Sequence, residues 1–134
     1  MVNESFLIGG HIYEYFAARP EKVAIVISAD LAHTHKVTKG PLKDKEPLGY
    51  DQCAEPFDKN CEKWAKNPTT KINLLLEQNR NIVKRALSCG YLGLVMATGM
   101  LKMHEIANKT YKPYFLERRH PTYFGMMVSY YELQ

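Results

Sequence analysis

The sequence predicts an α/β fold in which a sheet is flanked by helices. Three observations lead to this class. A short, continuously apolar run at residues 23–27 follows a turn that contains proline, which is typical of a strand buried on both faces. Several longer segments repeat apolar residues at helical spacing. Two runs near the C-terminus, residues 113–118 and 122–131, are rich in aromatic residues and favour strands.

The first part of the chain is expected to form a helix, a strand and a long loop. Residues 5–18 predict a helix capped by Ser5, with one broad apolar face made by Phe6, Ile8, Ile12, Tyr15 and Phe16. The Gly9-Gly10 pair costs about 1 kcal/mol per glycine relative to alanine, and such glycines let a neighbouring element approach closely. The strand at residues 22–28 follows. The glycine-, proline- and lysine-rich residues 34–50 predict an exposed loop that covers a site.

The middle of the chain is expected to be helical. A helix is predicted from about residue 51 or 55 to residue 66, and the later start suits Pro56, which belongs in a first turn. The buried stripe of this helix is expected to be Phe57, Cys61, Trp64 and Ala65. Helical periodicity continues over residues 69–87, with a break near residues 79–81. Another helix is predicted over about 91–105, before the two C-terminal strands.

Composition indicates one globular domain over residues 1–134, since 46% hydrophobic and 24% charged residues are ordinary proportions. The 18 basic and 14 acidic residues give a net charge of only +4 and are scattered, so no nucleic-acid partner is expected. No apolar run approaches the roughly 18 residues of a membrane span, and the N-terminus lacks a basic signal-peptide region. The three cysteines, Cys53, Cys61 and Cys89, have no zinc-site spacing and predict reduced thiols in the cytoplasm.

Two histidines and one cysteine are the candidate functional residues. In open α/β sheets, ligands bind beyond the carboxyl ends of the strands, where His33 and His35 follow the predicted strand. A histidine exchanges protons near neutral pH, which suits a catalytic acid/base or a metal ligand. The alternative is that both histidines and Asp30 only cap the strand and bind water. Cys89 precedes a predicted helix, whose N-terminus can stabilise a thiolate, whereas the alternative is a small buried thiol in a helix turn.

The stretch SADLAHTH at residues 28–35 resembles the B-subunit fold of class III extradiol ring-cleavage dioxygenases. An uncharacterised branch of that superfamily carries a similar stretch. The resemblance continues through Gly40-Pro41, Gly49-Tyr50, Ala54-Glu55-Pro56-Phe57-Asp58, Ser88-Cys89-Gly90-Tyr91 and YFGMMV at residues 123–128. It spans nearly the whole chain but covers only the C-terminal half of a complete family member. The resemblance therefore implies a partial version of the family fold, a three-layer-like sheet flanked by helices.

The resemblance also implies roles for single residues. In the family, the histidine that ends the strand motif is the acid/base near the catechol hydroxyls, which assigns this role to His33 and ranks His35 second. The family's iron ligands are two histidines from the N-terminal half and one glutamate from the region of Cys89, but no glutamate falls there in this chain. The related Memo proteins carry a Cys-Gly pair at that place, which implies Cys89 as the substitute metal ligand. His120-Pro121 falls on no ligand position and predicts a turn before the last strand.

Two functions of different classes follow from these observations. In the first, the chain is a subunit or fragment of an extradiol dioxygenase that uses Fe(II) and O₂ to open a small catechol-like aromatic ring. The two missing histidine ligands then come from an N-terminal half or a partner chain. In the second, the chain is a truncated, non-enzymatic homologue that acts as a binding or interaction protein. Because half of a sheet exposes an apolar edge, a homo-oligomer or a partner chain is expected in either case.

Overall fold

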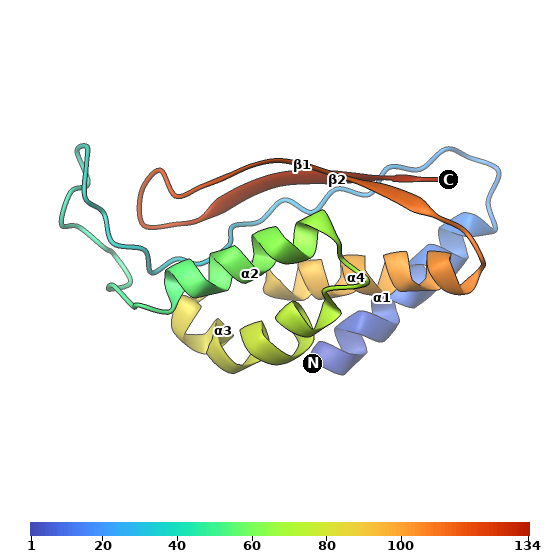
Figure 1. Ribbon diagram of the computed structural model, residues 1–134, viewed down its shortest axis with the longest axis horizontal. Helices are drawn as coiled ribbons and strands as arrows, with labels where there is room; N and C mark the ends of the chain where they lie inside the picture. Colours follow the sequence, from blue (N-terminus) through green and yellow to red (C-terminus); the bar gives the residue numbers. More distant parts are fainter.

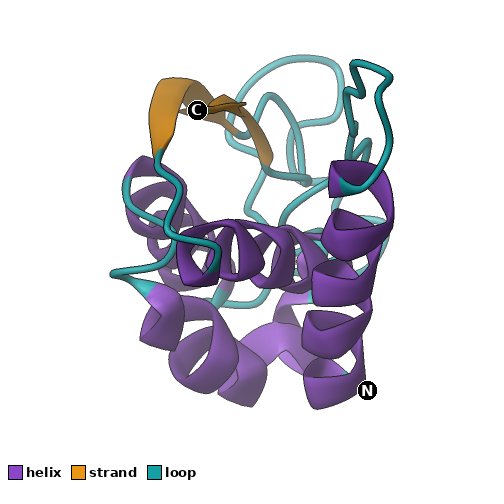
Figure 2. Cartoon of the chain, turned by 90° about the vertical axis from the view of Figure 1, so that its right-hand side faces the viewer, coloured by secondary structure: helices purple, strands orange, loops and turns teal.

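The computed structural model describes all 134 residues. Helices form one layer, and a β-hairpin lies along one side of that layer together with the irregular segments of the chain (Figures 1 and 2). The elements in chain order are α1 (Val2–Ala17), α2 (Ala54–Lys66), the π-helical turn η1 (Leu74–Asn79), α3 (Arg80–Ala86), α4 (Tyr91–Ile106), β1 (Tyr111–Arg119) and β2 (Met126–Leu133). The α/β class is therefore confirmed in its coarse form, as helices and a two-stranded antiparallel hairpin.

The hydrophobic core lies between α2, α4 and the inner face of the hairpin. Trp64 and Phe57 of α2 are among its largest fully buried side chains, as the stripe on this helix predicts. The indole N–H of Trp64 donates a 3.0 Å hydrogen bond to the Thr98 hydroxyl on α4. The Tyr131 hydroxyl on β2 donates to the backbone carbonyl of Ala65 at 3.1 Å. The core thus joins all three elements by packing and by hydrogen bonds.

Helix α1 packs on α4 through glycines, which confirms the predicted close approach. A Cβ at Gly9 would collide with the backbone carbonyl of Met96, and one at Gly99 would collide with that of Phe6. The predicted apolar face of α1 is only partly confirmed, because Phe6 packs against the core whereas Ile8 is 48% and Tyr15 60% exposed. The buried residues of α1 are instead Ser5, Gly9 and Gly10. A contact made through backbones selects small residues, so α4 covers the glycine side of α1 and leaves Ile8 and Tyr15 exposed.

The predicted buried strand at residues 22–28 is wrong. The segment is extended but residues 20–29 make no backbone hydrogen bond (Figure 1). Its side chains are largely exposed, and Val26 is 83% exposed. Ile27 reaches α4, where a Cβ at Gly93 would lie 2.9 Å from its Cγ2. A strand buried on both faces needs neighbours at its edges and cover on both sides, and this chain supplies helices on one side only.

The hairpin confirms both C-terminal strands with shifted boundaries. The strands β1 and β2 pair antiparallel, with a bulge between Phe115 and Glu117. Along β2 the side chains alternate, so that Met127 and Tyr131 pack on the core while an outer row stays exposed. That outer row is apolar and consists of Met126, Val128 and Tyr130. The hairpin is therefore apolar on both faces but covered on one.

The helices of the middle region follow the sequence predictions. α2 begins at the later of the two predicted starts, and the helical run after it changes from π-helix to α-helix at Asn79, next to the predicted break. The predicted loop at residues 34–50 is largely exposed and extends from the end of the molecule where α2 begins (Figure 1).

None of the helices combines the length with the apolar character that crossing a membrane requires.

Candidate functional site

The structure brings two of the predicted site residues together with Asp30. We call Asp30, His33 and Cys89 the cysteine cluster. One ligand atom from each of the three lies within 4.8 Å of the other two. His33 and Asp30 are half-buried, and the Cys89 thiol is exposed. A carboxylate, an imidazole and a thiol thus converge at a point that solvent can reach.

Backbone contacts hold the cysteine cluster in place. The Asp30 N–H donates to the Cys89 sulfur at 3.2 Å, and the Gly90 N–H donates back to the Asp30 carbonyl at 3.0 Å. The His33 N–H donates to the carbonyl of Ala86 at the end of α3, at 2.8 Å. A Cβ at Gly90 would lie only 2.7 Å from the Asp30 carbonyl oxygen, so a glycine is needed for this approach. The segment after the extended stretch is therefore tied to the turn between α3 and α4.

The pairing of His33 with Asp30 fixes which ring nitrogen can accept a proton. The Nε2 atom of His33 lies 3.1 Å from Oδ2 of Asp30. An ionised carboxylate only accepts hydrogen bonds, so Nε2 carries the proton and Nδ1 is left with a free lone pair. A carboxylate placed in this way orients the ring. The pair has the arrangement of a general acid/base.

The other predicted catalytic residue, His35, does not join the cysteine cluster. Its side chain is only 3% exposed and turns toward α2, where Nε2 lies 2.6 Å from Oδ2 of Asp58. Asp58 is fully buried and also accepts a 2.9 Å hydrogen bond from the Ala32 N–H. Residues 31–35 are further held by hydrogen bonds to the backbone of residues 123–125. The side chains of His35 and His33 therefore lie in two separate environments.

His35 lies instead in a second group of possible ligands that the sequence did not reveal. We call His35, Glu55 and His120 the histidine-glutamate cluster, in which one ligand atom of each lies within 4.8 Å of the others. His120 is in the turn between β1 and β2, as predicted, and its ring stacks on that of His35 with a centroid distance of 4.2 Å. No short-range spacing connects these three residues. The one available signal in the sequence was that His35 follows one predicted strand and His120 precedes another.

An arginine links the histidine-glutamate cluster to the rest of α2. Arg118 donates to the Glu55 carboxylate at 3.0 and 3.3 Å and to Glu62 at 2.7 Å. Burial raises the pKa of Glu55, but the hydrogen bonds and charge of Arg118 outweigh it, so the net pKa lies below the usual value. The hydrogen bonds from Arg118, with those from Lys66, also lower the pKa of Glu62. Both carboxylates are consequently ionised at neutral pH.

The two remaining cysteines are core residues. Burial raises the pKa of the Cys61 thiol, and burial together with Asp51 raises that of Cys53 to about 11. Both are therefore protonated thiols at neutral pH and unsuited to nucleophilic or ligand chemistry. Cys89 is the one exposed cysteine of the chain.

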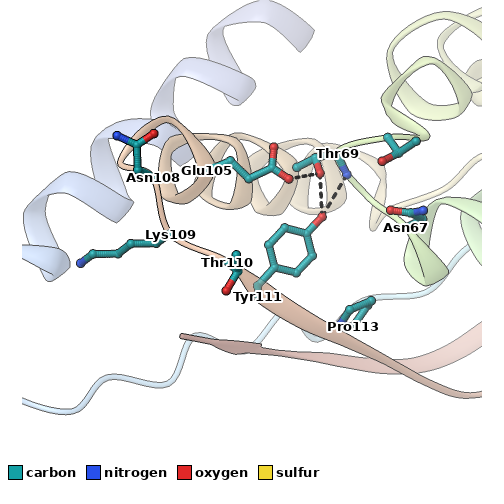
Figure 3. A pocket seen from close by; sticks show the side chains of 9 residues that line it. Asn67, Thr69, Glu105, Asn108, Lys109, Thr110, Tyr111 and Pro113 are labelled. Carbon is teal, nitrogen blue, oxygen red and sulfur yellow. Dashed lines mark hydrogen bonds between the residues drawn. The ribbon is translucent and has the colours of Figure 1, made fainter.

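A separate polar hollow of about 520 Å³ lies at the far end of α4 (Figure 3). The Thr69 hydroxyl contacts the Glu105 carboxylate there, and the Tyr111 hydroxyl lies 2.8 Å from the same Thr69 oxygen. Cys89 precedes α4 and Glu105 is near its end, so a helix of 16 residues, or about 24 Å, separates this hollow from the cysteine cluster. The Thr69 and Tyr111 hydroxyls and the Glu105 carboxylate therefore already bond within the hollow.

No family model matches the sequence, and no curated protein matches it either.

Proposed function

We propose that this chain carries part of the active site of an extradiol dioxygenase that opens a catechol-like aromatic ring with Fe(II) and O₂. The observation that supports the proposal most directly is the cysteine cluster. His33 and Cys89, the two residues that the family resemblance marks, lie far apart in the sequence but converge at Asp30. The resemblance itself rests on the SADLAHTH stretch and the segments that follow it.

In this proposal His33 is the catalytic acid/base. Its free Nδ1 takes the proton of a catechol hydroxyl, while Asp30 holds Nε2–H and stabilises the imidazolium that results. His33 then returns the proton to the ring-opened product. An imidazole suits both transfers, because it can take up a proton and release it again.

Cys89 and Asp30 offer donor atoms that fit a divalent transition metal. Iron accepts thiolate and carboxylate ligands, and Cys89 is accessible enough to bind as a thiolate, while His33 keeps its Nδ1 for proton transfer. Bound Fe(II) would supply the redox chemistry with O₂ that ring opening requires. Two donors do not complete a coordination sphere, so further ligands have to come from another chain or segment.

The extended segment at residues 20–29 favours such an incomplete assembly. Its backbone groups make no hydrogen bond, and apolar side chains such as Val26 face solvent. The outer row of β2 is apolar as well. A partner that adds strands and a second helical layer would complete a three-layer sheet and cover both features. We propose that a partner chain or a second copy does so, in the cytoplasm, where the three cysteines stay reduced.

The same exposed segment favours the second candidate function. A truncated homologue without catalysis would use the unpaired backbone of residues 20–29 to bind a partner by strand addition. In that case the cysteine cluster is a structural contact between α4 and the extended segment. The two functions differ in whether the cluster binds metal.

Metal binding and oxygen consumption test the proposal. Tag-free protein is reconstituted anaerobically with Fe(II), and iron content is measured for the natural chain, Cys89→Ala and His33→Ala. Cys53→Ala and His11→Ala are matched controls, because Cys53 is a buried thiol and His11 an exposed histidine outside both clusters. The proposal expects iron that is lost with Cys89→Ala, retained in both controls, and accompanied by O₂ uptake with catechols once the partner is present. Iron content that does not depend on Cys89 contradicts it.

A further inference from the structure

The histidine-glutamate cluster points to a second metal site that is independent of the proposed function. We propose that His35, Glu55 and His120 bind a divalent transition metal ion such as Zn²⁺. The three residues come from three separate segments: the end of the extended stretch, the first turn of α2 and the turn between the two strands. The fold brings their donor atoms within 4.8 Å of one another. Two imidazoles and one carboxylate are a common protein donor set for zinc, which leaves one position open.

Asp58 prepares His35 to be a ligand. The buried carboxylate of Asp58 lies 2.6 Å from Nε2 of His35 and can only accept, so the proton is on Nε2. The lone pair of His35 is consequently on Nδ1, the nitrogen that lies 3.9 Å from Oε2 of Glu55. A carboxylate that fixes the tautomer and orientation of a histidine is the usual support of a metal-bound imidazole.

The other two donors can adjust to an ion. His120 is exposed and stacks parallel to the His35 ring, with an angle of 2° between the planes. In a parallel stack the two lone pairs do not meet, so His120 turns about its side-chain bonds to converge with Nδ1 of His35. Glu55 is partly exposed, and a carboxylate supplies the negative charge that a divalent cation requires. One fixed donor and two adjustable donors are sufficient to close such a site.

Positive charge near the cluster is balanced by other acids. Arg118 pairs with Glu55, but it also donates to Glu62, which can hold its charge when Glu55 turns to a metal. Lys59 is 4.0 Å from Glu55 and mostly exposed, so it can move into solvent. Asp58 adds a third carboxylate on the side of His35. The charges that face the site are therefore three carboxylates against one guanidinium and one mobile ammonium.

To measure metal binding by the histidine-glutamate cluster alone, the Cys89 thiol of the cysteine cluster is removed first. Tag-free Cys89→Ser protein is titrated with Zn²⁺ by calorimetry, and with Co²⁺ by visible absorption, where a tetrahedral site gives an intense band. We expect about one equivalent of metal, bound at least about tenfold more weakly after a further His120→Ala or Glu55→Gln change. A further His11→Ala change leaves binding unaltered, because His11 is an exposed histidine on α1. Melting curves recorded in the presence of a chelator check that the metal-free His120→Ala protein is folded, as expected for a substitution at an exposed residue.

Two results would overturn the second site. One is Cys89→Ser protein that binds no Zn²⁺ or Co²⁺. The other is binding by the His120→Ala and Glu55→Gln proteins within about twofold of their Cys89→Ser parent. Because every variant lacks Cys89, these outcomes are independent of whether the cysteine cluster binds iron.

Discussion

Nε2 of His35 lies 2.6 Å from Oδ2 of Asp58, and both side chains are shielded from solvent. The pair joins the segment that follows the extended stretch to the middle of α2. Gly125, in the turn between the strands, packs so closely that a Cβ there would collide with the Asp58 carboxylate. Asp58 also holds the Ala32 N–H, so a single buried carboxylate fixes the chain on both sides of His33.

Replacing Asp58 is therefore expected to destabilise the protein strongly. Asp58→Ala leaves the Ala32 N–H and a histidine N–H without acceptors in a closed space, at a cost of about 3–5 kcal/mol. Asp58→Asn costs less, because an amide oxygen can keep the bond to Ala32. Urea unfolding at pH 7 measures both, with Glu77→Gln, an exposed carboxylate, as the control. A loss for Asp58→Ala no larger than that of the control would show that the pair is unimportant for folding.

The sequence was informative where local pattern decides the structure. The buried stripe of α2, the turn at His120-Pro121 and the two C-terminal strands all depend on spacing and turn chemistry within a few residues. The histidine-glutamate cluster could not be found in this way, because Glu55 and His120 meet only through the packing of the hairpin on α2. The apolar run at residues 23–27 indicates that another apolar surface packs against it. The run itself cannot show whether that surface belongs to this chain or to a partner.

The glycine contact between α1 and α4 predicts different effects for two adjacent substitutions. Gly9→Ala places a methyl group against the backbone carbonyl of Met96, which cannot move away, and is expected to cost about 1–3 kcal/mol. Gly10→Ala meets only the flexible side chain of Met103, so the gain in helix propensity of about 1 kcal/mol offsets the contact. Thermal and urea unfolding compare the two. Equal stabilities would mean that α1 does not dock on α4 through Gly9.

The ion pair between Asp51 and Arg85 predicts a pH-dependent contribution to stability. Hydrogen bonds from Arg85 are the largest cause that lowers the pKa of Asp51 from 3.8 to about 2. A carboxyl whose pKa is lower in the folded state stabilises the fold fully above its unfolded pKa, and this contribution is lost as the pH falls toward 2. Asp51→Asn should therefore lower the melting temperature at pH 5–7, with a difference from the natural protein that shrinks between about pH 4 and pH 2.

The control for this effect is Asp44→Asn. Asp44 lies exposed in the loop at residues 34–50, and it has a left-handed backbone conformation that asparagine tolerates. It forms no ion pair, so its substitution should change the melting temperature little at any pH. A difference between Asp51→Asn and the natural protein that persists unchanged at pH 2.5 would contradict a role for the ionised carboxylate.

The exposed segment at residues 20–29 predicts that the chain associates through it. Val26 is 83% exposed on a stretch whose backbone groups are unpaired, and a lysine at such an edge blocks strand pairing. Val26→Lys should leave the helical circular dichroism unchanged, because Val26 contributes little to the core, but should shift the molecular mass in light scattering from an oligomer to a monomer. Leu7→Lys is the control, since Leu7 is an equally apolar exposed residue on α1. If the natural chain is itself a monomer at all concentrations, a second copy does not cover the segment. The partner is then a different chain, and purification of the complex would be needed to identify it.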